Sequence, residues 1–106
     1  MDFAALQAAI AHLVRVGTHG REGLRKHGLL LDEVRASIAA NGELFGELFE
    51  DYPGDPRGPS CLILCFLPGD NPVHTVWAWN GRDEPFLITV YRPGPPKYTA
   101  DGRIRL

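Results

Sequence analysis

Histidine and tyrosine side chains in the second half of the chain offer the clearest opportunity for proton-transfer chemistry. His74 lies in the apolar stretch 73–80, and Tyr91 lies near the end of the stretch 86–92. Histidine has an unperturbed pKa of about 6.5, so it can serve as an acid or as a base near neutral pH. A tyrosine hydroxyl can donate a proton or hold an imidazole in position. Brought together, the two side chains would form a site for general acid–base chemistry.

Strand pairing is expected to bring His74 and Tyr91 together. The two stretches are rich in β-branched and aromatic residues, and the turn-forming run Asn-Gly-Arg-Asp-Glu-Pro separates them. If Trp79 pairs with Phe86, the Cβ atoms of His74 and Tyr91 lie about 5 Å apart. The other expected pairs are Trp77 with Ile88 and Val76 with Thr89. The bulky residues Phe86, Ile88 and Val90 should then face the helices, while His74, Thr89 and Tyr91 share the face turned away from them.

Three helices and four strands are expected to position these residues. Helical spacing of apolar residues, ended by glycine or Asn-Gly, predicts helices over residues 2–16, 19–27 and 31–40. Strands are predicted over residues 47–52, 61–67, 73–80 and 86–92, although the apolar positions near the first also suit a helix. Gly20 and Gly23 weaken the second helix, since each costs about 1 kcal/mol relative to alanine.

The pattern of elements indicates one α+β domain over residues 1–106. Its N-terminal helices would pack on one face of a three- to four-stranded antiparallel meander sheet. Three prolines in residues 93–106 predict an irregular tail that lies over the edge of the sheet. Trp77 and Trp79 are interpreted as core residues beneath the helices rather than as platforms for stacked bases.

The composition is typical of a soluble globular protein. The chain has 106 residues, of which 44% are hydrophobic and 23% charged, and no apolar run approaches the length of about 18 residues that a membrane span needs. The N-terminus lacks the features of a secretory signal, so a cytoplasmic location is expected. Residues 1–56 carry nine acidic and five basic side chains, whereas residues 57–106 carry four acidic and six basic ones. The basic half permits contact with a polyanion.

The two cysteines, Cys61 and Cys65, are expected to be buried thiols. On one strand they would lie roughly 13 Å apart, which is too far for a disulfide. No pair of histidines or cysteines has the spacing of a zinc motif, and no phosphate-binding glycine loop or nucleophile elbow is present. The sequence therefore predicts no metal and no other cofactor.

Taken in order, five segments (residues 19–34, 51–53, 58–62, 72–76 and 88–93) resemble those of a family of unknown function, DUF4258, and together they cover about residues 18–98. Residues 19–34 resemble its opening, in which a histidine begins a helix with arginines and a second helix starts with acidic residues. The family pattern has arginines where this chain has Gly23 and His27. The later matching segments are Asp51-Tyr52-Pro53, Gly58-Pro59-Ser60-Cys61-Leu62, Pro72-Val73-His74-Thr75-Val76 and Ile88-Thr89-Val90-Tyr91-Arg92-Pro93. The first predicted helix lies outside the resemblance.

The helix-then-meander layout is also similar to that of RelE-like and BrnT-like toxins, small ribonucleases of toxin–antitoxin pairs. These resemblances imply a metal-independent endoribonuclease that cleaves RNA by general acid–base catalysis, with RNA and an antitoxin or other protein as partners and no membrane. The candidate catalytic residues are His74, Tyr91 and His19. The candidate substrate-binding residues are Arg25, Thr89, Arg92 and Arg103.

The alternative is a non-catalytic binding module or an inactive toxin-like domain. In that interpretation His74 only packs against Tyr91 on a half-buried sheet face, and His19 is a polar surface residue near the start of a helix. His12 and His27 are interpreted as surface residues in either case.

Overall fold

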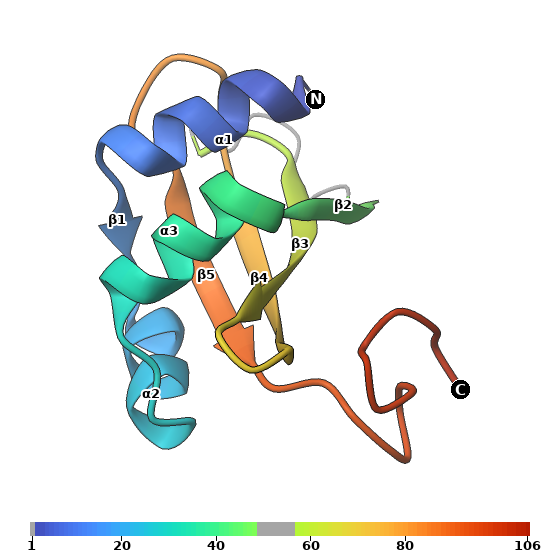
Figure 1. The fold of residues 1–106 in the computed structure, drawn as a ribbon. Coiled ribbons are helices and arrows are strands. Elements are labelled where there is room, and N and C mark those ends of the chain that lie inside the picture. The colour runs from blue at the N-terminus through green and yellow to red at the C-terminus, as the bar shows by residue number, and fades with distance from the viewer. Residues whose placement is uncertain (1, 49–56) are drawn as a thin grey trace.

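A computed structural model describes residues 2–48 and 57–106 of the chain. Its elements are, in order, α1 (Phe3–His12), β1 (Arg15–Val16), α2 (Thr18–Lys26), α3 (Leu31–Asn41), β2 (Glu43–Leu48), β3 (Ser60–Leu67), β4 (Asn71–Ala78) and β5 (Phe86–Tyr91). The strands form one sheet in the order β1-β5-β4-β3-β2, with α1 and α3 side by side across one face (Figure 1). The predicted α+β fold class is confirmed. No helix within the described ranges combines the length and the apolar character needed to cross a membrane.

The sheet is mixed rather than purely antiparallel, because β1 runs parallel to β5. The first helix, expected over residues 2–16, ends at His12, and the next residues enter the sheet instead. The amide of Arg15 donates to the carbonyl oxygen of Pro85 over 2.9 Å, and the amide of Gly17 donates to that of Leu87 over 3.1 Å. The short strand β1 therefore forms because its backbone pairs with β5. The local sequence around residues 15–16 does not predict this pairing.

The helix α1 is fixed to α3 by both polar and apolar contacts. The guanidinium of Arg35 donates to the carbonyl oxygens of Ile10, over 2.8 Å, and Ala11, over 3.0 Å, near the C-terminal end of α1. Leu6 and Ile10 are fully buried in the core. Since a helix leaves its last carbonyl groups without helical partners, Arg35 both ends α1 and holds it in place.

The helix α2 lies against β5 because two of its glycines let the backbones approach closely. A Cβ atom at Gly20 would lie 2.8 Å from the carbonyl oxygen of Leu87, and one at Gly23 would collide with the carbonyl oxygen of Val90. The residues that weaken α2 as an isolated helix thus allow it to dock.

The strand β2 begins earlier than the predicted strand over residues 47–52, of which residues 49–52 lie outside the described ranges. The Asn41 side chain accepts a hydrogen bond from the amide of Phe66, over 2.8 Å, and donates to its carbonyl oxygen, over 2.9 Å. This bond pair joins the end of α3 to β3, so the chain enters the sheet directly after Gly42. A bulge between Leu44 and Gly46 leaves Phe45 as the extra residue.

The register between β4 and β5 is the predicted one near His74 but shifts further along. The pairs His74–Tyr91 and Val76–Thr89 are confirmed. The pairs predicted for Trp77 and Phe86 are wrong, since Trp77 lies opposite Leu87 and Ala78 lies opposite Phe86. A bulge after Val76 inserts one extra residue into β5 and reverses the side-chain alternation beyond it. Leu87 therefore joins the core in place of Ile88.

The main core lies between the sheet and the helices α1 and α3. Its fully buried members include Val34 and Ile38 of α3 and Ile63, Val73 and Trp77 of the sheet. Trp79 packs at its margin. Both cysteines are buried as predicted, and burial raises the pKa of the Cys65 thiol to about 12.

The tail, which we define as residues 93–106, covers the opposite face of the sheet. Figure 1 shows it on the side away from α1 and α3. The carbonyl oxygen of Gly102 lies 2.8 Å from Nε2 of His74, and the ring centroid of Tyr98 lies 4.6 Å from that of the imidazole. Arg103 forms an ion pair with Glu43 of β2 at 2.6 Å. The expectation that the tail lies over the sheet edge and leaves this face open is wrong around His74.

Candidate functional site

His74 is bonded through both of its ring nitrogens and is fully buried. Its Nδ1 lies 3.2 Å from the hydroxyl oxygen of Tyr91, and its Nε2 bonds Gly102 of the tail. The rings of Phe45, Tyr91 and Tyr98 surround it, with centroids between 4.6 and 5.3 Å from the imidazole. His74 therefore lies opposite Tyr91, as the strand register predicts. The tail, however, separates His74 from solvent.

The hydrogen bonds of His74 define which nitrogen carries the proton. A carbonyl oxygen can only accept, so Nε2 donates to Gly102. Burial lowers the pKa of His74 more than this bond raises it, which favours the neutral ring. Nδ1 of the neutral ring is then an acceptor, and the hydroxyl of Tyr91 donates to it. The hydrogen bond to His74 thus fixes the orientation of the Tyr91 phenol.

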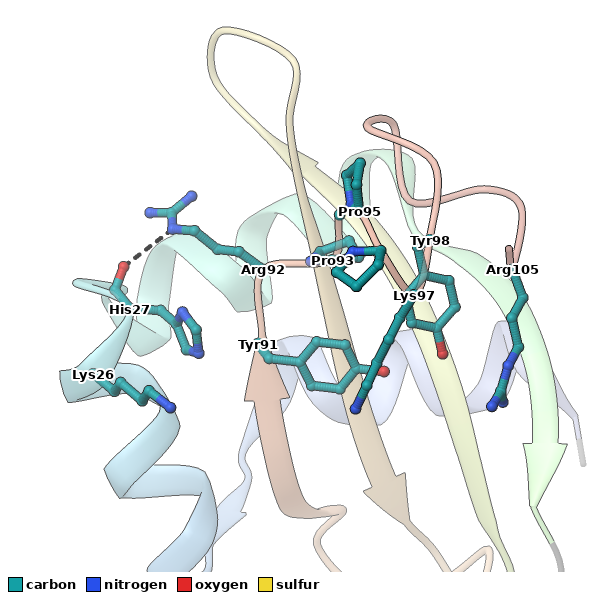
Figure 2. A pocket seen from close by; sticks show the side chains of 11 residues that line it. Lys26, His27, Tyr91, Arg92, Pro93, Pro95, Lys97, Tyr98 and Arg105 are labelled. Atoms are coloured by element: carbon teal, nitrogen blue, oxygen red, sulfur yellow. Dashed lines mark hydrogen bonds between the residues drawn. The ribbon is translucent and has the colours of Figure 1, made fainter.

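Tyr91 itself lines a groove between α2 and the tail, which we call the basic groove. It has a volume of about 510 Å³ and is lined by Lys26, His27, Tyr91, Arg92, Pro93, Gly94, Pro95, Pro96, Lys97, Tyr98 and Arg105. Figure 2 shows Lys26 and His27 on one side, Lys97, Tyr98 and Arg105 on the other, and the ring of Tyr91 extending between them. None of the described residues that line this groove is acidic.

The cationic side chains of the groove affect the pKa values of its histidine and tyrosine. Burial, with the nearby charges of Lys26 and Arg92, lowers the pKa of His27, so its imidazole is neutral near pH 7. The guanidinium Nε of Arg92 donates to the backbone carbonyl of His27 over 3.2 Å, which holds Arg92 beside α2. Burial and the neighbouring hydroxyl of Tyr98 raise the pKa of Tyr91, although the charge of Arg105 lowers it. Tyr91 therefore remains a protonated donor within a positively charged groove.

A second hollow, on the other side of Tyr91, contains two further predicted site residues. It has a volume of about 480 Å³, and His19 and Thr89 line it together with Lys26, His27 and Tyr91. His19 is exposed and lies 3.6 Å from the carboxylate of Glu22. Tyr91 and the end of α2 thus border both hollows, and His19 lines the second hollow together with Tyr91.

Two of the predicted substrate-binding arginines lie elsewhere. Arg25 is exposed on α2 and is not among the residues that line either hollow. Arg103 pairs with Glu43 and lies over the ring of Phe66, with 4.9 Å from its guanidinium carbon to the ring centroid. Its position makes Arg103 an anchor of the tail rather than part of the groove. Of the predicted arginines, Arg92 is the one that lines the groove beside Tyr91.

Sequence reasoning missed most of the cations that line the groove. Lys97 and Arg105 stand eight positions apart in the tail, yet a single backbone bridge between Tyr98 and Arg105 places them near one another. The density of basic residues in the tail was a usable signal for them. His27, interpreted as a surface residue, is partly buried and lines both hollows. No comparable signal in the sequence singled out Lys26 or Tyr98.

A metal site does not emerge from the side chains in the described ranges, where no three His, Cys, Asp or Glu residues are grouped so that they could hold an ion. The chemistry that the described groove offers is positive charge, a phenol donor and the neutral imidazole of His27. This set suits the binding of phosphate groups and the transfer of protons near them.

Comparison with known proteins gives one match. The family model described as Domain of unknown function (DUF4258) matches residues 16–92. No curated protein and no solved structure matches the chain. The matched range begins in β1 and ends at Arg92, so α1 and the whole tail lie outside it.

Proposed function

The chain belongs to the DUF4258 family, and from the geometry of its basic groove we propose that it binds RNA. The observation that carries this proposal is the grouping of Lys26, Arg92, Lys97 and Arg105 around one concave surface without an acidic residue among its described lining. The earlier resemblance to RelE-like ribonucleases favours RNA over other polyanions.

The groove has the two components that single-stranded nucleic acid requires. Lysine and arginine side chains neutralise phosphates and release the counterions condensed on the strand. Tyr91 and Tyr98 are partly exposed in the same groove and offer aromatic surface on which a base can stack. RNA would therefore lie along the groove with its phosphates between α2 and the tail.

Binding is tested by fluorescence anisotropy with a short labelled single-stranded RNA at several salt concentrations. If all four cations contact phosphates, the slope of log K against log salt is about −2.8, and it falls to about −1.4 in the double variant Lys26→Gln, Arg92→Gln. The matched control is Arg21→Gln, Arg82→Gln, which removes two exposed charges outside the groove and keeps the wild-type slope. Equal slopes for both double variants, or no binding by the wild type, would refute the proposal.

A second candidate function is cleavage of the bound RNA without a metal, as in RelE-like toxins. The hydrogen bond from Tyr91 to His74 favours it, because this bond orients a phenol at the edge of the cationic groove. In this mechanism the hydroxyl of Tyr91 turns from Nδ1 of His74 toward the leaving oxygen and gives it the proton, while His27 or His19 takes the proton of the attacking 2′-hydroxyl. The protonated histidine then returns a proton to the phenolate through solvent, which restores the starting state. Arg92 stabilises the charge that develops on the phosphate. His74 acts through Tyr91 and does not touch the substrate.

Cleavage is tested with purified protein and labelled RNA, and by overexpression in cells. Wild-type protein is expected to cut RNA in the presence of a chelator and to slow growth, whereas Tyr91→Phe, which removes one oxygen, loses both effects while still binding RNA. The control His12→Ala alters an exposed histidine of α1 and keeps both. A wild-type protein that binds RNA and leaves it intact excludes the ribonuclease and leaves the binding module.

A further inference from the structure

The basic groove has two walls of different origin. One wall, with Lys26 and Arg92, belongs to the part of the chain that the family model matches. The other wall, with Lys97 and Arg105, belongs to the tail, which lies beyond the last matched residue. The second half of the cationic surface therefore lies outside the matched region.

The tail is held together by its own backbone hydrogen bonds. Within it, the amide of Leu106 donates to the carbonyl oxygen of Lys97 over 2.8 Å, and the amide of Thr99 donates to that of Ile104, also over 2.8 Å. These bonds make a closed loop that presents Lys97 and Arg105 together. The stretch Pro93–Pro96, with Gly94, connects this loop to β5.

The loop is held on the sheet by a small number of contacts. Its polar anchors include the bond between Gly102 and His74 and the ion pair between Arg103 and Glu43, both described above. The remaining attachment includes the packing of Tyr98 against the rings of His74 and Phe45. The exposed ion pair is worth little in water, so docking depends mainly on the region around His74.

The two walls of the groove carry charges of the same sign, so they repel each other when no ligand is bound. Lys26 and Arg92 repel Lys97 and Arg105, which disfavours the docked tail. A phosphate between the walls attracts all four groups and removes this repulsion. A ligand that contacts both walls binds the docked form better than the undocked one, and it must shift the tail toward docking.

We propose that the tail is a clamp that closes on RNA in the basic groove. The clamp rests on the RNA binding proposed above and adds that Lys97 and Arg105 carry part of the affinity through tail docking. The class of ligand is a single strand with at least two phosphates, one facing each wall.

Hydrogen–deuterium exchange of tail peptides, with and without a short single-stranded RNA, measures the docking directly. RNA is expected to slow exchange in residues 94–106 of the wild type, and Lys97→Gln, Arg105→Gln is expected to lose this protection. Faster exchange with RNA would mean that the tail opens on binding, and it would overturn the clamp.

Anisotropy with tail variants measures the coupling to affinity. Gly102 has a φ of +74°, and a Cβ atom there would lie 2.6 Å from Cγ of Pro93 and 3.3 Å from Nε2 of His74, so Gly102→Ala should displace the tail from His74 while keeping every cation. It is expected to weaken RNA binding at least about fivefold, the lower end of the usual coupling between linked sites. Gly46→Ala is the control, since Gly46 lies outside the groove and no neighbouring atom lies within 4 Å of a Cβ atom at that position.

The outcomes separate the two proposals. Wild-type affinity in both Gly102→Ala and Lys97→Gln, Arg105→Gln, together with weak binding by Lys26→Gln, Arg92→Gln, overturns the clamp and keeps the RNA groove. Absence of RNA binding by the wild type overturns both.

Discussion

At the scale of single residues, His74 acts as a connector between the sheet and the tail. Its two nitrogens bond Tyr91 on one side and Gly102 on the other, and no part of its side chain reaches solvent. Buried polar groups of this kind are costly when they lose a partner. His74 thereby fixes both the phenol at the groove and the position of the tail wall.

Replacement of His74 by alanine is expected to lower the free energy of unfolding by about 2–4 kcal/mol, because it leaves a cavity and removes the partner of Tyr91 and Gly102. Urea denaturation followed by tryptophan fluorescence measures this change. His12→Ala, at an exposed position, should alter the same free energy by less than about 0.5 kcal/mol. Similar stabilities for the two variants would contradict the connecting role of His74.

At the scale of elements, the docking of α2 on β5 determines where Lys26 and His27 lie. The two glycines of the helix face carbonyl oxygens of β5, and this close approach places the end of α2 beside Arg92. A helix held at the normal distance by side chains would move this wall of the groove outward.

Gly23→Ala tests the docking of α2. In an isolated helix this change would stabilise by about 1 kcal/mol. Here the added methyl group meets the carbonyl of Val90, so a net loss of about 1–3 kcal/mol in unfolding free energy is expected. Thermal denaturation of this variant beside Gly94→Ala, which has open space, provides the comparison. A raised melting temperature for Gly23→Ala would show that the helix does not require the close approach.

The parts of this fold that sequence could predict are those encoded by local patterns. The spacing of apolar residues places α3 and the strands β3 to β5, and alternation places His74 opposite Tyr91. The bulge after Val76 shifts the pairing of β4 and β5 by one residue, and nothing in the local sequence predicts it. The strand β1 and the path of the tail arise from contacts between residues far apart in the chain, such as His74 with Gly102.

The difference between local patterns and long-range contacts also explains why only part of the candidate site could be predicted from the sequence. The strand pattern predicts Tyr91 and the orientation of His74, whereas the groove requires the tail to fold back over the sheet. A helix position assigned to solvent, His27, becomes part of the site because the tail builds a wall opposite it.

At the scale of the whole molecule, two histidines make stability depend on pH. The pKa values of His74 and His27 are both lowered in the folded protein, mainly by burial. Below about pH 6.5 the unfolded chain therefore binds more protons than the folded one, and stability falls as the pH falls. Above this pH both residues are neutral in both states, and their contribution is constant. The titratable groups in contact with His74 are Tyr91, whose hydroxyl donates to Nδ1, and Tyr98, whose ring packs against the imidazole.

The melting temperature is therefore expected to decrease between about pH 7.5 and about pH 5.5. His74→Gln, which keeps a polar side chain but does not titrate, should flatten this dependence, and His12→Gln should leave it unchanged. Calorimetry of the three proteins across this range measures the effect. An unchanged slope in His74→Gln would assign the dependence to other groups.

The positions of α1 and the tail have a consequence for how this family is delimited. Both segments lie outside the matched range 16–92, and they cover opposite faces of the same sheet. A chain cut at the limits of the match would lose Leu6 and Ile10 from one side and the cover of His74 from the other. The matched stretch thus keeps α3 on one face of the sheet but lacks α1 beside it, and it lacks the tail on the other face. A chain with different segments in these two places would present a different binding surface on the same inner sheet.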